Sequence, residues 1–289
     1  TNSNGVTAFG TGSFSLGSGA NGYNDNTENF VAWCWEAGTA FSNDASATSV
    51  GNHDSTGRVS SSGAFSITSF TGSSGSELEL AHGLGGVPEM IFVKNLANAS
   101  ANWAVYHKHN GNTKYMLLQD GMGVPGSGNV NYWHNTTPTS SVFTVGSGGT
   151  PDTNGDGNAM IAYCFRSVPG VCKVGHYFGN QDANGPYIGT GFRPSLVMMK
   201  WVSGGGLSAE GWIVKDTARS PTNENRTDLY WSSTGTEGTG STHGIDILSA
   251  GFRLKGTGGA NNISGGTYLY LALGDLQGGG KSLPPIYGR

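Results

Sequence analysis

A sequence block that occurs twice constrains the fold of this chain more than any other feature. Residues 85–94 (GGVPEMIFVK) match residues 191–200 (GFRPSLVMMK) in a glycine, a proline, a lysine and four apolar positions, 106 residues apart. The match continues at an offset of 109, where Trp103 corresponds to Trp212. Apolar positions that persist while the offset drifts indicate matching strands joined by loops of different length. The chain therefore contains two copies of one unit, a pattern typical of modular, surface-presenting proteins.

The block that closes each unit occurs three times. It is a triplet with apolar residues at both ends and a polar residue between them, followed by a short apolar run, at residues 14–16 with 31–35, 143–145 with 161–165, and 252–254 with 269–273. The first copy has no front half, so we expect residues 1–35 to be the closing strands of a preceding partial repeat. Alone, these strands would leave Phe14, Val31 and Trp33 in water. They complete a sheet either within this chain or in another copy by strand addition, which makes these three residues assembly candidates.

Composition favours short strands and many turns. Of 289 residues, 50 are Gly and only 12% are charged, while aromatic residues reach 10% and recur among Val, Ile and Leu. Disordered chains lack such recurring aromatics. The net charge of −4 and the scattered distribution of 15 basic residues argue against nucleic-acid binding. No apolar run approaches the ~20 residues of a membrane span, so we expect a soluble protein without membrane insertion.

Alternation with period two predicts an all-β fold. Val31, Trp33 and Trp35 share one face of their run, and no stretch of ten residues shows a helical apolar period. We predict tandem antiparallel β-sandwiches of jelly-roll or concanavalin-like type. Residues 90–94 and 196–200 lack clean alternation, which indicates central strands that are covered on both faces.

The repeat also divides the chain. The expected parts are the closing strands at 1–35, a linker or long loop at 36–62 with an edge strand near 58–60, a first sandwich at 63–168, a second sandwich at 169–276, and an extended tail at 277–289. Small polar residues dominate the linker. The tail contains Pro284 and Pro285, which lack the amide donors that a central strand needs.

The positions of the three cysteines favour a packing role over disulfide formation. Cys34 and Cys164 occupy equivalent positions in two closing runs, which favours buried small hydrophobic residues. Cys172 follows a turn at 168–170, so a hairpin that pairs it with Cys164 in a disulfide is the alternative.

An acidic loop is a weak calcium candidate. Asp152, Asn154 and Asp156 place oxygen ligands at alternate positions, with a glycine at the turn. The twelfth position of such a loop is Tyr163, which cannot supply the usual bidentate carboxylate. The favoured interpretation is an Asx-rich turn, with a structural Ca²⁺ as the alternative and no other cofactor.

An aromatic segment is the candidate for sugar binding. Asn131, Tyr132, Trp133 and His134 combine rings, which cover the apolar face of a sugar, with amides that meet its hydroxyl groups. The alternative is that Tyr132 and Trp133 belong to the core.

Catalytic motifs are weak. Glu77 and Glu79 are the only pair that imitates the carboxylates of a glycosidase, and isolated acidic pairs of this spacing are usually solvated. His107 and His109 share a strand face without a third zinc ligand nearby in the sequence. We therefore expect a protein that is not an enzyme.

The order of the motifs resembles a known family. The motifs are residues 31–35 (VAWCW), 63–72 (GAFSITSFTG), 82–94 (HGLGGVPEMIFVK), 102–107 (NWAVYH) and 264–270 (SGGTYLY). Together they resemble a repeat domain of uncharacterised role in structural proteins of bacteriophages, many of them marine. The resemblance covers nearly the whole chain and supplies no catalytic residues. It implies a virion location, in a tail fibre or a fibre attached to the capsid, with host attachment as the role.

These observations lead to one expected function and two rivals. The expected function is a self-associating, non-enzymatic virion protein that contacts other virion proteins and, through its loops, host-surface glycans, since weak sugar sites gain from multivalency. The first rival is a purely structural fibre, capsid-decoration or filament subunit assembled by strand addition. The second is a polysaccharide-degrading enzyme. Burial of Tyr132 and Trp133 would favour the structural rival, and a cleft with Glu77 and Glu79 would favour the enzyme.

Overall fold

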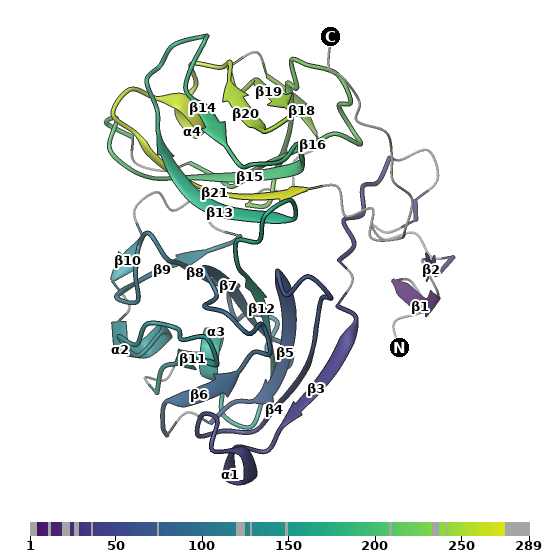
Figure 1. The fold of residues 1–289 in the computed structure, drawn as a ribbon, viewed down its shortest axis with the longest axis vertical. Helices are drawn as coiled ribbons and strands as arrows, with labels where there is room; N and C mark the ends of the chain where they lie inside the picture. The colour runs from purple at the N-terminus through teal and green to yellow at the C-terminus, as the bar shows by residue number, and fades with distance from the viewer. Residues whose placement is uncertain are drawn as a thin grey trace. The chain divides into compact units, whose positions relative to one another are not determined.

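The computed structural model shows two compact units, residues 1–36 and 37–289. It describes residues 5–10, 13–18, 24–25, 29–35, 37–73, 75–119, 125–127, 129–147, 150–207, 210–232, 237–240 and 242–274. The first unit contains an antiparallel hairpin of β1 (Val6–Gly10) and β2 (Ser13–Leu16), in which Phe9 lies opposite Phe14 (Figure 1).

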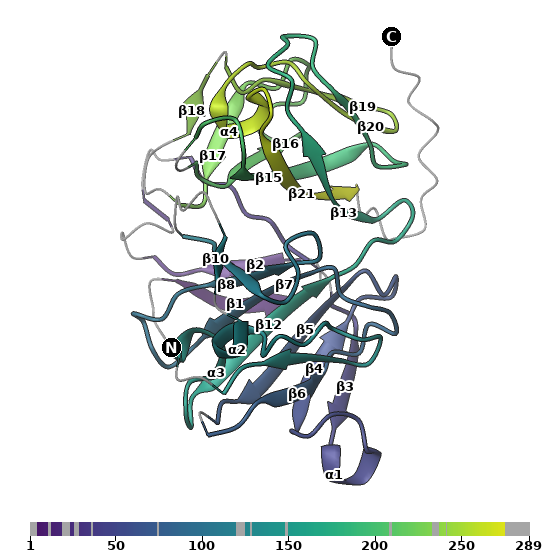
Figure 2. The ribbon, with the colours of Figure 1, turned by 90° about the vertical axis from the view of Figure 1, so that its left-hand side faces the viewer.

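The second unit begins with an antiparallel sandwich. Its large sheet has the order β10-β9-β8-β7-β12-β5-β4-β3. These strands are β3 (Thr39–Asn43), β4 (Ser55–Val59), β5 (Phe65–Thr71), β7 (Met90–Asn95), β8 (Ala104–His107), β9 (Lys114–Leu117), β10 (Gly126–Ser127) and β12 (Ala159–Phe165). The facing sheet pairs β6 (Leu78–Ala81) with β11 (Val142–Val145). Short helices α1 (Ala45–Thr48), α2 (Asn129–Tyr132) and α3 (Pro151–Asn154) lie in the connections (Figure 2).

A second sandwich repeats this topology. Its large sheet contains β13 (Cys172–Phe178), β15 (Pro194–Ser203), β16 (Ile213–Asp216), β17 (Thr227–Tyr230), β18 (Gly238–Thr239) and β21 (Thr267–Gly274). Their order, β13-β21-β15-β16-β17-β18, corresponds strand by strand to β5-β12-β7-β8-β9-β10. The facing sheet contains β14 (Tyr187–Gly189), β20 (Gly251–Leu254) and β19 (Ile245–Leu248), and α4 (Gly259–Asn262) corresponds to α3. The all-β prediction is confirmed, and the sequence repeat is a structural repeat.

Each core lies between the two sheets of its sandwich. In the first, Ile91 and Val93 of β7 face Phe143 of β11, and all three side chains are completely buried. β12 points its small residues Ala162 and Cys164 into the same core. Because small side chains leave room for the large rings opposite, the two sheets pack closely. β7 is central and buried on both faces over Met90–Val93, as its lack of alternation predicts.

The linker prediction for residues 36–62 is wrong. This segment contains β3, α1 and β4, which extend the first sheet beyond β5 by two strands. The edge strand expected near 58–60 is β4, and β3 pairs outside it. Packing explains why a segment rich in small polar residues forms strands. A Cβ atom at Gly57 would lie 2.7 Å from the Phe41 ring, and one at Gly83 would lie 2.8 Å from it. Glycine at both positions therefore lets this ring approach the backbone closely.

The expected strand at 31–35 is also wrong. Described residues 29–35 carry no strand, and Cys34 is exposed although its equivalent Cys164 is completely buried. The equivalent run in β12 is paired on both sides, by β5 and β7, whereas no such partner strands are seen for residues 31–35 in the part of the chain that the structure describes. Alternation makes a strand only where partner strands exist.

Cys164 and Cys172 are buried free thiols, so the structure does not contain the alternative disulfide. The predicted tail at 277–289 lies outside the described residues. Among the helices that the structure describes, none has the length and apolar character needed to cross a membrane.

Candidate functional site

The aromatic segment proposed for sugar binding lies mostly in the core. Trp133 is 1% exposed and packs edge-on against Tyr106, with ring centroids 5.7 Å apart. Tyr132 is 9% exposed and stacks on Tyr115 at 3.7 Å. Asn131 is exposed at the surface and His134 is half-buried. The two rings therefore belong to the core, which was the alternative interpretation, and do not form a platform for a sugar.

The acidic loop uses its side chains within the protein. Asp152 is buried and accepts hydrogen bonds from the Asn102 backbone N–H (2.7 Å), the Asn102 side chain (3.0 Å) and the Tyr132 hydroxyl (2.9 Å). Burial and the Asp152 carboxylate raise the pKa of Tyr132. Asp156 is exposed. Within the described residues, no three His, Cys, Asp or Glu side chains are grouped to hold a metal ion.

The buried side chain of Asn154 links separate backbone segments by hydrogen bonds. Its Oδ1 accepts from the Ser73 backbone N–H, and its Nδ2 donates to the carbonyl oxygens of Ser73, Ser76 and Gly146. Asn262, the equivalent residue in α4, accepts from a backbone N–H and donates to two carbonyl oxygens in the same way. This second copy carries no acidic loop, which indicates a structural role for the position.

Calcium is therefore expected to have little effect on stability. Because the oxygens of Asp152 and Asn154 already accept protein hydrogen bonds, a bound ion would have to displace them. We expect the thermal unfolding midpoint to be the same in millimolar CaCl₂ and in a chelator such as EDTA. A rise in the midpoint with Ca²⁺ that Asp152→Asn abolishes would contradict this interpretation.

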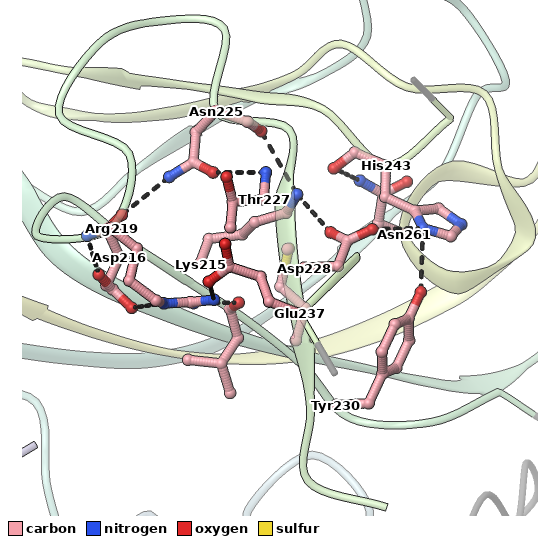
Figure 3. A network of polar contacts seen from close by, with 12 residues as sticks. Lys215, Asp216, Arg219, Asn225, Thr227, Asp228, Tyr230, Glu237, His243 and Asn261 are labelled. Carbon is pink, nitrogen blue, oxygen red and sulfur yellow. Dashed lines mark hydrogen bonds and ion pairs between the residues drawn. The ribbon is translucent and has the colours of Figure 1, made fainter. Parts of the chain in front are cut away.

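A different set of polar residues forms a buried network in the second sandwich (Figure 3). Lys215 on β16 forms an ion pair with Oδ1 of Asp228 on β17. The Lys215 side chain is completely buried and Asp228 is 2% exposed. Nδ1 of His243 lies 3.0 Å from Oδ2 of Asp228 and 3.2 Å from the Tyr230 hydroxyl. Lys215 Nζ also donates to the Asn225 carbonyl oxygen at 3.3 Å.

Neighbouring residues hold this network in place. Arg219 donates from Nε to Asp216 (2.6 Å) and from Nη1 to Glu237 (2.9 Å). The Asn225 side chain donates to the Asp216 backbone carbonyl at 2.9 Å. Asn261 of α4 donates to the His243 backbone carbonyl at 3.0 Å. Four elements therefore converge on one buried cluster: β16, β17, the segment before β19, and α4.

Burial changes the acid–base behaviour of the cluster. Desolvation lowers the pKa of Lys215, and the Asp228 charge opposes this shift without cancelling it. Burial and the charge of Asp228 raise the pKa of Tyr230 to about 12. A buried ammonium with a lowered pKa is closer to its neutral, nucleophilic amine form than a lysine in water.

The first sandwich has no such ion pair at the equivalent place. The strand registers make Tyr106 equivalent to Lys215 and Tyr115 equivalent to Asp228. Tyr106 is buried in the apolar core, and Tyr115 packs against it. The second sandwich therefore has a buried ion pair where the first has two tyrosines. Stability alone does not explain this pair, because the cost of desolvating both charges offsets most of their attraction.

Lys215 and Asp228 are not among the site residues expected from the sequence. Each is a charged residue beside apolar ones in a short strand, at Ile213–Asp216 and Thr227–Tyr230, in a chain that has few charges. That placement is the signal that could have identified them. The pairing of β16 with β17 was needed to show that the two charges meet.

The remaining predicted residues lie at surfaces. Phe14 is on β2 and is 37% exposed, and Val31 and Trp33 are half-buried outside any strand. Glu79 is on β6 and Glu77 precedes it, and both are partly exposed. The Asn52 side chain hydrogen-bonds to the backbone at both positions.

One sheet edge is unguarded. β3 ends the eight-stranded sheet and, among the described strands, pairs only with β4. Its sequence TAFSN has no charged residue and no proline, and most of its side chains are exposed. Every residue of strands β1 and β2 is also exposed, including four large apolar side chains, Val6 (46%), Phe9 (85%), Phe14 (37%) and Leu16 (39%).

Comparisons with known proteins place the chain in a family. No curated protein and no solved structure matches it. A family model described as a domain of unknown function, DUF7483, matches residues 1–275. Since this match includes both sandwiches and the N-terminal hairpin, the chain belongs to the DUF7483 family.

Proposed function

We propose that this chain is a non-enzymatic structural module of a virion appendage, a phage tail fibre or capsid fibre, whose copies associate by β-strand addition. The location comes from the resemblance of its repeat motifs to phage structural proteins. The β3 edge is the observation that carries the mode of assembly.

An unguarded edge favours pairing with another chain. Edge strands present a row of backbone N–H and C=O groups, and proteins usually block them with charged residues, proline or bulges. β3 has none of the charges or prolines that serve this purpose. An added strand would continue the eight-stranded sheet by backbone hydrogen bonds.

The N-terminal hairpin is the proposed donor. A two-stranded hairpin alone is marginally stable in water, and this one exposes Phe9 and Phe14 as a cross-strand pair. Added to the β3 edge of a second copy, β1 and β2 would gain a sheet and cover apolar surface. Phe14 keeps its role as an assembly candidate, whereas Val31 and Trp33 lie outside the strands that would pair.

Attachment to host glycans is not assigned to the Tyr132–Trp133 segment, because both rings are buried. The purely structural role is therefore the better-supported of the two non-enzymatic functions. Any attachment role would fall on exposed loops.

Light scattering on the full chain over a range of concentrations tests this proposal. We expect oligomers or filaments whose mass increases with concentration. Ala40→Lys with Ser42→Lys puts two charges on exposed positions of β3 and should leave a monomer. Phe9→Ser with Phe14→Ser should have the same effect on the donor side.

A matched control separates edge blocking from added charge. Ala97→Lys with Ala99→Lys adds the same charges at the same spacing on an exposed loop after β7, and should assemble like the unmodified chain. A chain that remains monomeric at every concentration would overturn the proposal. Assembly that survives the β3 substitutions would exclude β3 as the acceptor.

A further inference from the structure

We propose that Lys215 and Asp228 form a covalent isopeptide bond that links β16 to β17. The proposal rests on the arrangement in Figure 3, where an amine, a carboxyl group and an imidazole are held together inside the second sandwich. It does not depend on the proposed virion function.

The register of β16 and β17 brings the two reacting groups into contact. Lys215 and Asp228 lie opposite each other on adjacent antiparallel strands, one pair beyond the Val214–Leu229 pair. Nζ of Lys215 contacts Oδ1 of Asp228 directly, so it is also near the carboxyl carbon. Reacting groups that a fold holds at contact react as if at effective concentrations of about 10⁵–10⁸ M.

Burial supplies the second argument. Both side chains are almost entirely shielded from water, at 0% and 2% exposure. Condensation needs the neutral amine as the nucleophile, and a dry site disfavours the charged ammonium. Burial lowers the pKa of Lys215 accordingly.

His243 forms a hydrogen bond with the carboxyl group of Asp228. A carboxylate only accepts hydrogen bonds, so the Nδ1–H of His243 donates to Oδ2 of Asp228 at 3.0 Å. The donor is therefore placed on the oxygen that must leave. The Tyr230 hydroxyl, 3.2 Å from the same nitrogen, and the Asn261 contact to the His243 backbone orient the ring.

The reaction balances without any added reagent. Nζ of Lys215 attacks Cγ of Asp228, and the Nζ–Cγ bond forms while the Cγ–Oδ2 bond breaks. Two of the three ammonium protons move to the carboxyl group, whose Oδ2, hydrogen-bonded to Nδ1–H of His243, leaves with them as water, and the third proton stays on the amide nitrogen. No oxidation or reduction takes place.

The contrast between the sandwiches explains why the pair occurs only once. Tyr106 and Tyr115 occupy the equivalent positions in the first sandwich and cannot condense with each other. An uncondensed buried ion pair gives little net stability, whereas an amide at the same place is uncharged and closes the β16–β17 connection into a loop.

Mass spectrometry of the denatured full chain tests the proposal. The expected intact mass is lower than the sequence mass by one water molecule. After tryptic digestion, cleavage at Lys215 should be lost, and the peptide 201–219 should be recovered joined to the peptide 227–253. Cleavage at Lys200, which is also buried and whose Nζ donates to the Glu210 backbone carbonyl, should be normal and serves as the internal control.

Three variants sharpen the result. Lys215→Arg and Asp228→Ala should each show the full mass of their sequence, because neither can form the amide. His243→Ala keeps both reacting groups and should leave a fraction of the chain at the full sequence mass. An unmodified chain at its full sequence mass would overturn the proposal, and so would a water loss without the joined peptides, as a succinimide would produce.

Discussion

Lowering the pH from 7 to 4 is expected to reduce the free energy of unfolding by several kcal/mol, because two completely buried histidines resist protonation. Burial lowers the pKa of His82 to about 4 and that of His107 to about 3. In the unfolded chain both return to about 6.5.

The hydrogen bonds explain why the folded state excludes the proton. Nδ1 of His82 accepts from the Leu84 backbone N–H at 3.2 Å, and its Nε2 donates to the Thr139 carbonyl. Nδ1 of His107 accepts from the His109 N–H at 3.1 Å. A proton on either Nδ1 would face another donor, so the charged form loses a bond as well as its hydration.

The sign follows from proton linkage. Both folded pKa values are below the unfolded value, so the stabilisation is complete above pH 6.5 and is lost as the pH falls towards 4 and 3. One pKa unit corresponds to about 1.4 kcal/mol, so each histidine accounts for about 3 kcal/mol at pH 4. Urea unfolding at pH 7, 5.5 and 4 measures this loss.

A double glutamine variant separates the contribution of the two histidines from that of carboxylates that titrate in the same pH range. His82→Gln with His107→Gln keeps a donor and an acceptor at each position but removes the titration. The decline in unfolding free energy between pH 6.5 and 4 should then be smaller by several kcal/mol than in the unmodified chain. Equal declines in both proteins would show that these two histidines do not control the acid response.

The sequence predicted the repeated part of the fold because repetition is a pattern of apolar positions. The offset between residues 85–94 and 191–200 corresponds to β7 and β15, which occupy the same place in two sheets of the same order. The lack of alternation in 90–94 correctly indicated a central strand. These signals are local, and a single sequence contains them.

What the sequence did not reveal depended on neighbours. The run 31–35 has the alternation of β12 but not its partner strands, so it is not a strand. β3 and β4 have a composition typical of loops, and they fold because Gly57 and Gly83 accept the Phe41 ring. Local pattern is necessary for a strand, and pairing decides it.

The candidate site shows the same limit. Asp152 and Asn154 matched part of a calcium loop because Asx residues serve turns and cations alike, and only their hydrogen-bond partners show which role is filled. Lys215 and Asp228 are 13 residues apart, a spacing without a motif. Their contact exists because β16 and β17 pair in one particular register.

Two equivalent tryptophans provide the second large expected effect. Trp212 is completely buried, and its Nε1 donates to the Leu117 carbonyl of the first sandwich at 3.1 Å. Trp103, its equivalent, is half-buried and stacks on Tyr163 with ring centroids 6.0 Å apart. The repeat thus uses one position in two ways, and only the second copy joins the sandwiches through it.

Trp212→Ala is expected to lower the free energy of unfolding by about 3–5 kcal/mol, because it leaves a large cavity and an unpaired carbonyl at Leu117. Trp212→Phe keeps most of the ring and should cost about 1–3 kcal/mol, mainly for the lost hydrogen bond. Trp103→Ala, the matched control, should cost about 1–2 kcal/mol because its ring is partly solvated already. Urea unfolding followed by circular dichroism gives all three values. Equal losses for Trp212→Ala and Trp103→Ala would mean that the contact to Leu117 does not couple the sandwiches. The expected order makes Trp212 one of the contacts that join the two sandwiches, beside the stacked rings of His109 and His176.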